Sequence, residues 1–117
     1  MNTRGAAAEA QAADFLRRKG FTVLARNYLT KGGEIDIVAR EKKTLVFVEV
    51  KSRKNNAFGG AVGAVTSAKQ KRVEWAALQY IKENRPSFDS IRFDVICITP
   101  EKTEHIPNAF CPIRLTL

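Results

Sequence analysis

The stretch Leu45–Val50 restricts the fold more than any other part of the chain, because Glu49 is its only charged residue and the other five are apolar. Alternate side chains of a strand point to opposite faces, so apolar residues at both odd and even positions predict a central strand covered on both sides. A charge within such a strand is costly unless something compensates it. The sequence therefore predicts a layered fold in which Glu49 needs a partner.

A preceding apolar stretch carries Asp36, and the dipeptide Lys42-Lys43 between the two is short enough for a hairpin turn. With those two residues as the turn, Asp36 lies directly opposite Glu49, and Lys51 shares the face of Glu49. Neighbouring carboxylates repel and resist ionisation unless a cation is near. A hard divalent ion such as Mg²⁺ (or Mn²⁺) prefers oxygen ligands. The pattern predicts a metal site that could support hydrolysis of a phosphodiester.

Simpler interpretations of the same residues remain open. Glu49 and Lys51 could form an ion pair on a solvated edge, or a structural protein could use them in a buried ion network. Asp36 could serve a turn, and Glu34, which shares the face of Asp36, could be a ligand or a supporting group.

The remaining patterns predict one domain over residues 1–117, with the element order α-β-β-β-α-β. We expect a helix over residues 5–19, strands over 21–28, 33–40, 44–51 and 91–99, and a helix from the cap Thr66 to about Asn84. The tail from His105 could add a fifth short strand. Residues 52–65 are glycine-rich and predict a loop. The fold class is therefore α/β, with a mixed sheet flanked by helices.

The first predicted helix has a face of small side chains on which Glu9 is the only charge. Small residues allow a helix to approach a sheet closely, which would bring Glu9 near whatever lies beneath. A glutamate at the rim of the helix is an equally open interpretation. The face consists of Gly5, Ala6, Glu9, Ala12, Ala13 and Leu16.

The chain carries 20 Lys and Arg against 12 Asp and Glu, a net charge of +8. Such a surplus is typical of proteins that meet a polyanion, here nucleic acid or an acidic membrane surface. The basic residues around the acidic motif favour nucleic acid, with DNA as the expected partner, and predict contacts to its phosphates. They are Lys31, Arg40, Lys42, Lys43, Arg53, Lys54, Lys69, Lys71 and Arg72. The sequence shows no recognition helix and no aromatic stacking platform, so we expect no reading of base sequence.

No apolar run approaches the roughly 20 residues that span a bilayer, and no signal peptide is recognisable, which predicts a cytoplasmic protein without membrane contact. Cys97, Cys111 and the single histidine, His105, lack the spacing of a zinc site. Cys97 lies in an apolar run and is expected to be a reduced core residue.

The spacing from Asp36 to Glu49-Val50-Lys51 resembles the signature of the PD-(D/E)XK nuclease superfamily, with Ile35 in place of the proline. Further segments from about Gly5 to Ile98 resemble the YraN-like uncharacterised bacterial family, described as endonuclease-like and similar to Holliday-junction resolvases. They are Gly5 to Glu9, Gly20, Arg26-Asn27-Tyr28, Gly33 to Asp36, Leu45 to Lys51, Lys69 to Arg72, and Arg92-Phe93-Asp94.

The resemblance implies a restriction-endonuclease-like fold and a magnesium-dependent endonuclease, with selectivity for junctions or branched DNA suggested by the likeness to resolvases. It implies that Asp36, Glu49 and Glu9 hold the metal with the backbone carbonyl of Val50. Lys51 would position or activate the attacking water or stabilise charge on the phosphate, and Gln70 would lie beside the site. The alternative is a non-catalytic nucleic-acid-binding module with a nuclease fold. A homodimer would suit an enzyme that cuts a junction, although no residue requires one.

Overall fold

The computed structural model describes residues 3–53 and 66–110, with side chains from residue 5 onward. The fifth short strand that the sequence left open is present and begins at Thr103, so the order is α-β-β-β-α-β-β. The elements are α1 (Thr3–Arg18), β1 (Thr22–Leu29), β2 (Glu34–Glu41), β3 (Thr44–Ser52), α2 (Ser67–Asn84), β4 (Ser90–Ile98) and β5 (Thr103–Ile106). The loop predicted over residues 52–65 lies mostly outside the described residues.

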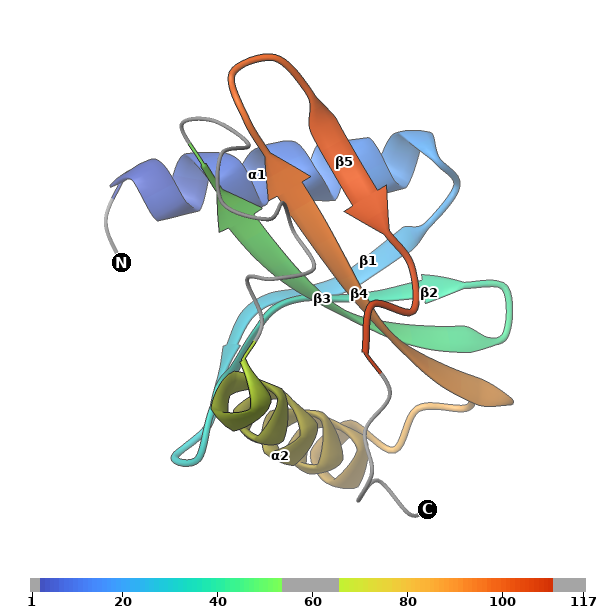
Figure 1. The fold of residues 1–117 in the computed structure, drawn as a ribbon. Helices are drawn as coiled ribbons and strands as arrows, with labels where there is room; N and C mark the ends of the chain where they lie inside the picture. Colours follow the sequence, from blue (N-terminus) through green and yellow to red (C-terminus); the bar gives the residue numbers. More distant parts are fainter. Residues whose placement is uncertain (1–2, 54–65, 111–117) are drawn as a thin grey trace.

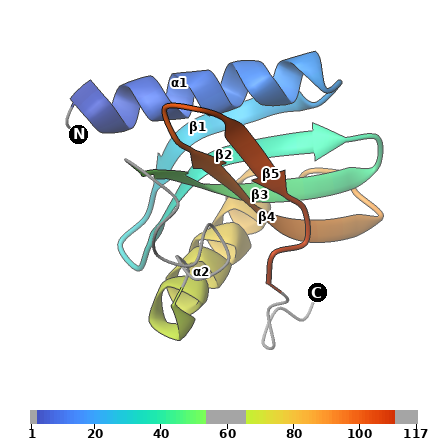
Figure 2. The same cartoon turned by 45° about the horizontal axis from the view of Figure 1, so that its top comes forward.

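The strands form one sheet in the order β1-β2-β3-β4-β5, with β3 at its centre. Only β3 and β4 run parallel, and the other neighbours are antiparallel, so the sheet is mixed as predicted. A parallel pair needs a crossover connection, and the segment that contains α2 supplies it. Helices α1 and α2 cover opposite faces of the sheet (Figures 1 and 2).

The central strand is covered on both sides, which confirms the prediction from its apolar pattern. Leu45 and Phe47 pack in the core beneath α2, and Val46 and Val48 pack in the core beneath α1. All four side chains are fully buried. The charged end of β3 therefore continues directly from the best-packed part of the molecule.

Both helices bury a narrow stripe against the sheet. In α1 the stripe runs through Ala8, Ala12 and Leu16 at a spacing of four residues, while Gly5 and Ala6 are exposed. The predicted face is therefore buried from Glu9 to Leu16, whereas its N-terminal end stays exposed. In α2 the Thr66 side chain caps the helix by accepting a hydrogen bond from the Lys69 N–H at 3.2 Å. Within the described residues, no helix is long and apolar enough to cross a membrane.

Candidate active site

The site forms where the regular pairing of β2 and β3 ends. Their paired residues run from Glu41–Thr44 to Ile37–Val48, which confirms the predicted register with its turn at Lys42 and Lys43. The next pair along the two strands would join Asp36 and Glu49. The recorded pairing stops one step short of them.

Strand β2 also rotates at Asp36. Ile35 packs beneath α2 whereas Ile37 packs beneath α1, although strict alternation would place both on one face. The Asp36 side chain then replaces a backbone partner, because its Oδ2 accepts a hydrogen bond from the Val50 N–H at 2.8 Å. A carboxylate is thus held between two strands where they separate.

Strand β1 is irregular at the same level. Asn27 lies between Arg26, which is opposite Ile37, and Tyr28, which is opposite Ile35. Its φ of 53° is in the left-handed region, which asparagine tolerates better than most residues. Two adjacent strands therefore distort together beside Asp36, and they leave a hollow there.

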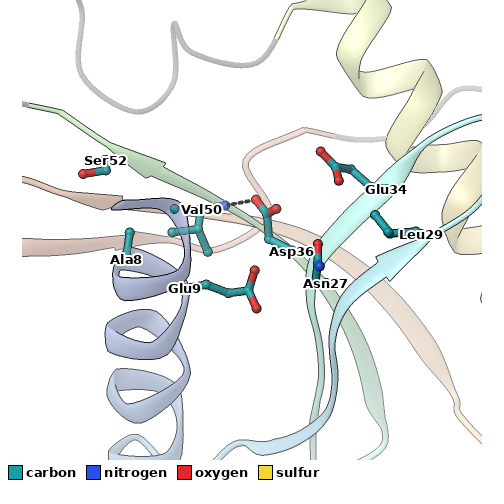
Figure 3. A pocket seen from close by; sticks show the side chains of 9 residues that line it. Ala8, Glu9, Asn27, Leu29, Glu34, Asp36, Val50 and Ser52 are labelled. Atoms are coloured by element: carbon teal, nitrogen blue, oxygen red, sulfur yellow. Dashed lines mark hydrogen bonds between the residues drawn. The ribbon is translucent and has the colours of Figure 1, made fainter. Parts of the chain in front are cut away.

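The hollow has a volume of about 450 Å³ and receives carboxylates from two elements, Glu9 from α1 and both Glu34 and Asp36 from β2 (Figure 3). Glu9 is only 5% exposed, and its Oε1 lies 3.3 Å from the Arg26 Nε. Glu9 is therefore a buried residue that lines the hollow and not an exposed residue at the rim of the helix. The full lining is Gly5, Ala8, Glu9, Asn27, Leu29, Glu34, Asp36, Val50 and Ser52.

Glu49 is nearly inaccessible and carries two cationic neighbours. Its side chain is 3% exposed, and its Oε1 lies 3.5 Å from the Lys51 Nζ. The Lys69 Nζ contacts the same oxygen. Lys69 reaches it from the first turn of α2, next to the capping residue Thr66. Two ammonium groups from different elements therefore converge on one buried carboxylate.

Burial and the Glu49 charge raise the pKa of Asp36 to about 7, although the Val50 N–H and Lys69 act in the opposite direction. Burial and a contact with Lys69 lower the pKa of Lys51, which the Glu49 charge only partly offsets. Burial would also lower the pKa of Lys69, but its contacts with Glu49 and Lys51 raise it overall. The cluster therefore favours a proton on Asp36 and a positive charge on Lys69.

This donor set suits magnesium better than a metal that needs a complete protein cage. No three His, Cys, Asp or Glu side chains in residues 3–53 and 66–110 form a ready metal cluster. Mg²⁺ commonly uses one or two carboxylates and completes its shell with waters and substrate phosphate. The raised pKa of Asp36 indicates that this carboxyl lacks a nearby cation, and the ammonium groups at Glu49 show that its carboxylate attracts positive charge. The residues present fit a bound Mg²⁺ on those grounds.

The sequence did not reveal that Lys69 contacts Glu49, and it predicted this residue only as a phosphate contact. Its position follows from the packing of α2 on the sheet, which local patterns do not reveal. A lysine just inside a predicted helix start was the sole signal. Gln70 lies at the start of α2, where its backbone N–H bonds the Thr66 carbonyl at 2.9 Å, and its predicted role stays a prediction.

The predicted phosphate-binding cations fall into separate groups. Arg40, Lys42 and Lys43 lie toward the β2–β3 turn, and Lys42 is about 20 Å along β2 from Asp36 at 3.3 Å per residue. Lys31, Lys69 and Arg72 instead line a second hollow that shares Leu29 and Glu34 with the first. Lys71 and Arg53 are exposed near these hollows, and Lys54 lies outside the described residues. The second group is therefore the one that adjoins the candidate active site.

Comparison with known proteins agrees with the family suggested by the sequence. Residues 8–98 match the model of the uncharacterised protein family UPF0102. A UPF0102 protein of Serratia proteamaculans is 47% identical over 108 residues, which cover 91% of this chain and 92% of that protein. One from Pectobacterium carotovorum is 44% identical over 114 residues, with coverage of 94% and 97%.

The fold is similar to that of Hjc, a Holliday junction resolvase from Archaeoglobus fulgidus. The superposition has a TM-score of 0.58 at 18% sequence identity and covers 90% of this chain and 73% of the resolvase. At this identity the likeness establishes a resolvase-like fold and nothing about activity.

Proposed function

The chain belongs to the uncharacterised protein family UPF0102, and from its site we propose a metal-dependent endonuclease that hydrolyses DNA phosphodiester bonds at junctions or other branched structures. One observation carries the proposal. Asp36, whose ionised form is disfavoured, lies beside Glu49 and Lys51 at the point where β2 and β3 separate. The resolvase-like fold supports it as analogy.

The chemistry assigns a role to each group of the cluster. Asp36, Glu49 and the Val50 carbonyl would hold Mg²⁺, with Glu9 and Glu34 across the hollow. Bound magnesium would polarise the scissile phosphate and lower the pKa of a coordinated water. Lys51, whose pKa is lowered by burial, would accept the proton of the attacking water or stabilise charge on the phosphate. Lys69 would leave Glu49 when magnesium enters and would then be available to a phosphate.

One observation favours a second candidate, a non-catalytic nucleic-acid-binding module. Glu49 is already neutralised by the ammonium groups of Lys51 and Lys69, so its charge does not require a metal. A protein of this kind would bind DNA through the same cations without cutting it.

The test is a cleavage assay on labelled single-stranded, duplex, flap and four-way-junction DNA with Mg²⁺ or Mn²⁺. We expect metal-dependent cutting by the wild type, strongest on branched DNA, and a loss of at least 100-fold in Glu49→Gln, since the ligand charge is removed. Asp14→Asn is the matched control, because Asp14 is exposed and pairs with Arg17 in the same helix. Binding without cutting in all three proteins would support the non-catalytic module.

A further inference from the structure

Two of the three large apolar residues that are exposed in the described part of the chain lie at or beside the second hollow. Leu24, Leu29 and Trp75 are the large exposed apolar residues within residues 3–53 and 66–110. Leu29, 63% exposed, lines the hollow directly. Trp75, 49% exposed, packs against Gly32, which also lines it. Exposed apolar side chains that gather at one hollow indicate a binding surface more than scattered ones do.

The turn between β1 and β2 fixes Trp75 in place. Thr30 and Gly33 close the turn, with the Thr30 N–H donating to the Gly33 carbonyl at 2.8 Å. A side chain on Gly33 would collide with the Arg72 carbonyl, and one on Gly32 would collide with the pyrrole edge of the Trp75 indole. The turn backbone therefore seats directly on α2 and covers one edge of the indole. Trp75 as a whole remains about half exposed to solvent.

The same hollow, of about 400 Å³, is positively charged. Lys31 from the turn and both Lys69 and Arg72 from α2 line it, against the single carboxylate of Glu34. In the described part of the chain, the salt bridges involve neither Lys31 nor Arg72. Lys69 meanwhile links the hollow to Glu49 in the candidate active site. An anionic chain that lies in the hollow would therefore run on into the site.

We propose that this hollow binds an unpaired segment of DNA beside the scissile phosphate, with one base stacked on Trp75 and the adjoining phosphates held by Lys31 and Arg72. Bases within a duplex present no free face, whereas an unpaired base can stack on an exposed aromatic ring. Cations spaced around such a ring are the usual arrangement in sites for single strands. The inference rests on the proposed nuclease function for its ligand, and it names single-stranded character next to the cut as the feature selected.

Trp75 is the only tryptophan of the chain, so its intrinsic fluorescence reports on this position without a label. The experiment titrates the full-length protein, in EDTA to prevent cutting, with oligothymidylate, with an abasic strand of equal length and with a blunt duplex. Stacking predicts strong quenching by oligothymidylate and little by the abasic strand or the duplex. Binding of oligothymidylate by anisotropy without quenching, or no binding at all, would overturn the proposal.

Variants then separate stacking from charge, with binding followed by anisotropy of labelled strands. Trp75→Leu should weaken the binding of oligothymidylate about tenfold and leave the binding of the abasic strand unchanged. Trp75→Phe should restore part of the lost affinity. Arg72→Ala should weaken the binding of both strands. It should also reduce the salt dependence of the binding constant by an amount that corresponds to about one phosphate contact. Lys82→Ala is the matched control, a cation in the last turn of α2 that does not line the hollow, and it should change binding less than twofold. Equal losses in Arg72→Ala and Lys82→Ala would overturn the assignment to this hollow.

These outcomes are independent of catalysis. Quenching without any metal-dependent cutting would reject the nuclease and keep the strand-binding hollow. Cutting of branched DNA with no role for Trp75 would keep the nuclease and reject the hollow.

Discussion

Asp36 and Asp94 are two aspartates of one sheet whose surroundings shift their pKa values in opposite directions. Asp94 is fully buried and accepts hydrogen bonds from the Arg92 Nε and a terminal guanidinium nitrogen, the His105 Nε2 and the Asn108 N–H, at 2.7–2.9 Å. Burial raises its pKa, but these partners outweigh burial and lower it overall. Asp36 receives the Val50 N–H and lies beside a second carboxylate, and its pKa rises to about 7.

The environment of His105 shows how completely Asp94 is satisfied. The Lys19 Nζ lies 2.8 Å from the His105 Nδ1, and lysine can only donate, so Nδ1 accepts. The proton of the ring is then on Nε2 and points to Asp94. The edges of Phe15 and Phe21 enclose the ring. Asp94 therefore stabilises the fold. The ionised form of Asp36 instead lowers stability, and a bound cation would relieve that cost.

The largest expected effect is in the satisfied aspartate. Asp94→Asn should lower the free energy of unfolding by about 3–5 kcal/mol, because it replaces a fully buried carboxylate that accepts hydrogen bonds from Arg92, His105 and the Asn108 N–H with an amide that cannot accept all of them. Urea unfolding measures it. Asp89→Asn is the matched control, since Asp89 is exposed and 4.0 Å from Lys43, and it should change stability by less than about 0.5 kcal/mol. A change below about 1 kcal/mol in Asp94→Asn would contradict the claim that Asp94 stabilises the fold.

Asp36→Asn should have the opposite sign in EDTA. The folded state holds the Asp36 proton up to about pH 7 while the unfolded chain releases it near 3.8, so this group's contribution to stability falls as pH rises between those values. Relative to the wild type, the variant should gain stability across that interval, on the order of 2 kcal/mol by pH 8. Urea unfolding at several pH values checks this. A loss similar to that of Asp94→Asn would mean that Asp36 is a structural group.

Lys69→Gln should have the smallest effect, because its own side chain is 27% exposed and Lys51 still contacts Glu49 after the change. We expect a loss of about 1 kcal/mol without metal. Added Mg²⁺ should stabilise this variant more than the wild type, since the lysine no longer competes for Glu49. Thermal unfolding with and without Mg²⁺ measures both. Equal stabilisation of the two proteins would show that Lys69 and magnesium do not share a place.

The element order, the register and the buried β3 could be read from the sequence because each depends on local spacing, as with the Lys42-Lys43 turn. The rotation of β2 at Asp36 could not, since it places Ile35 and Ile37 on different faces against their alternation. The partners of Asp94 were also hidden, because His105 and Asn108 come from β5 and the segment after it. Trp75 was not recognised as a stacking surface, since its exposure depends on how the β1–β2 turn packs on α2.

Carboxyl ¹³C NMR titration of the aspartates, with and without Mg²⁺, tests the central distinction most directly. The account predicts that Asp36 titrates near 7 in EDTA and much lower with Mg²⁺, whereas Asp94 stays below its ordinary pKa in both. An Asp36 that titrates at or below its ordinary pKa and does not respond to Mg²⁺ would contradict the account.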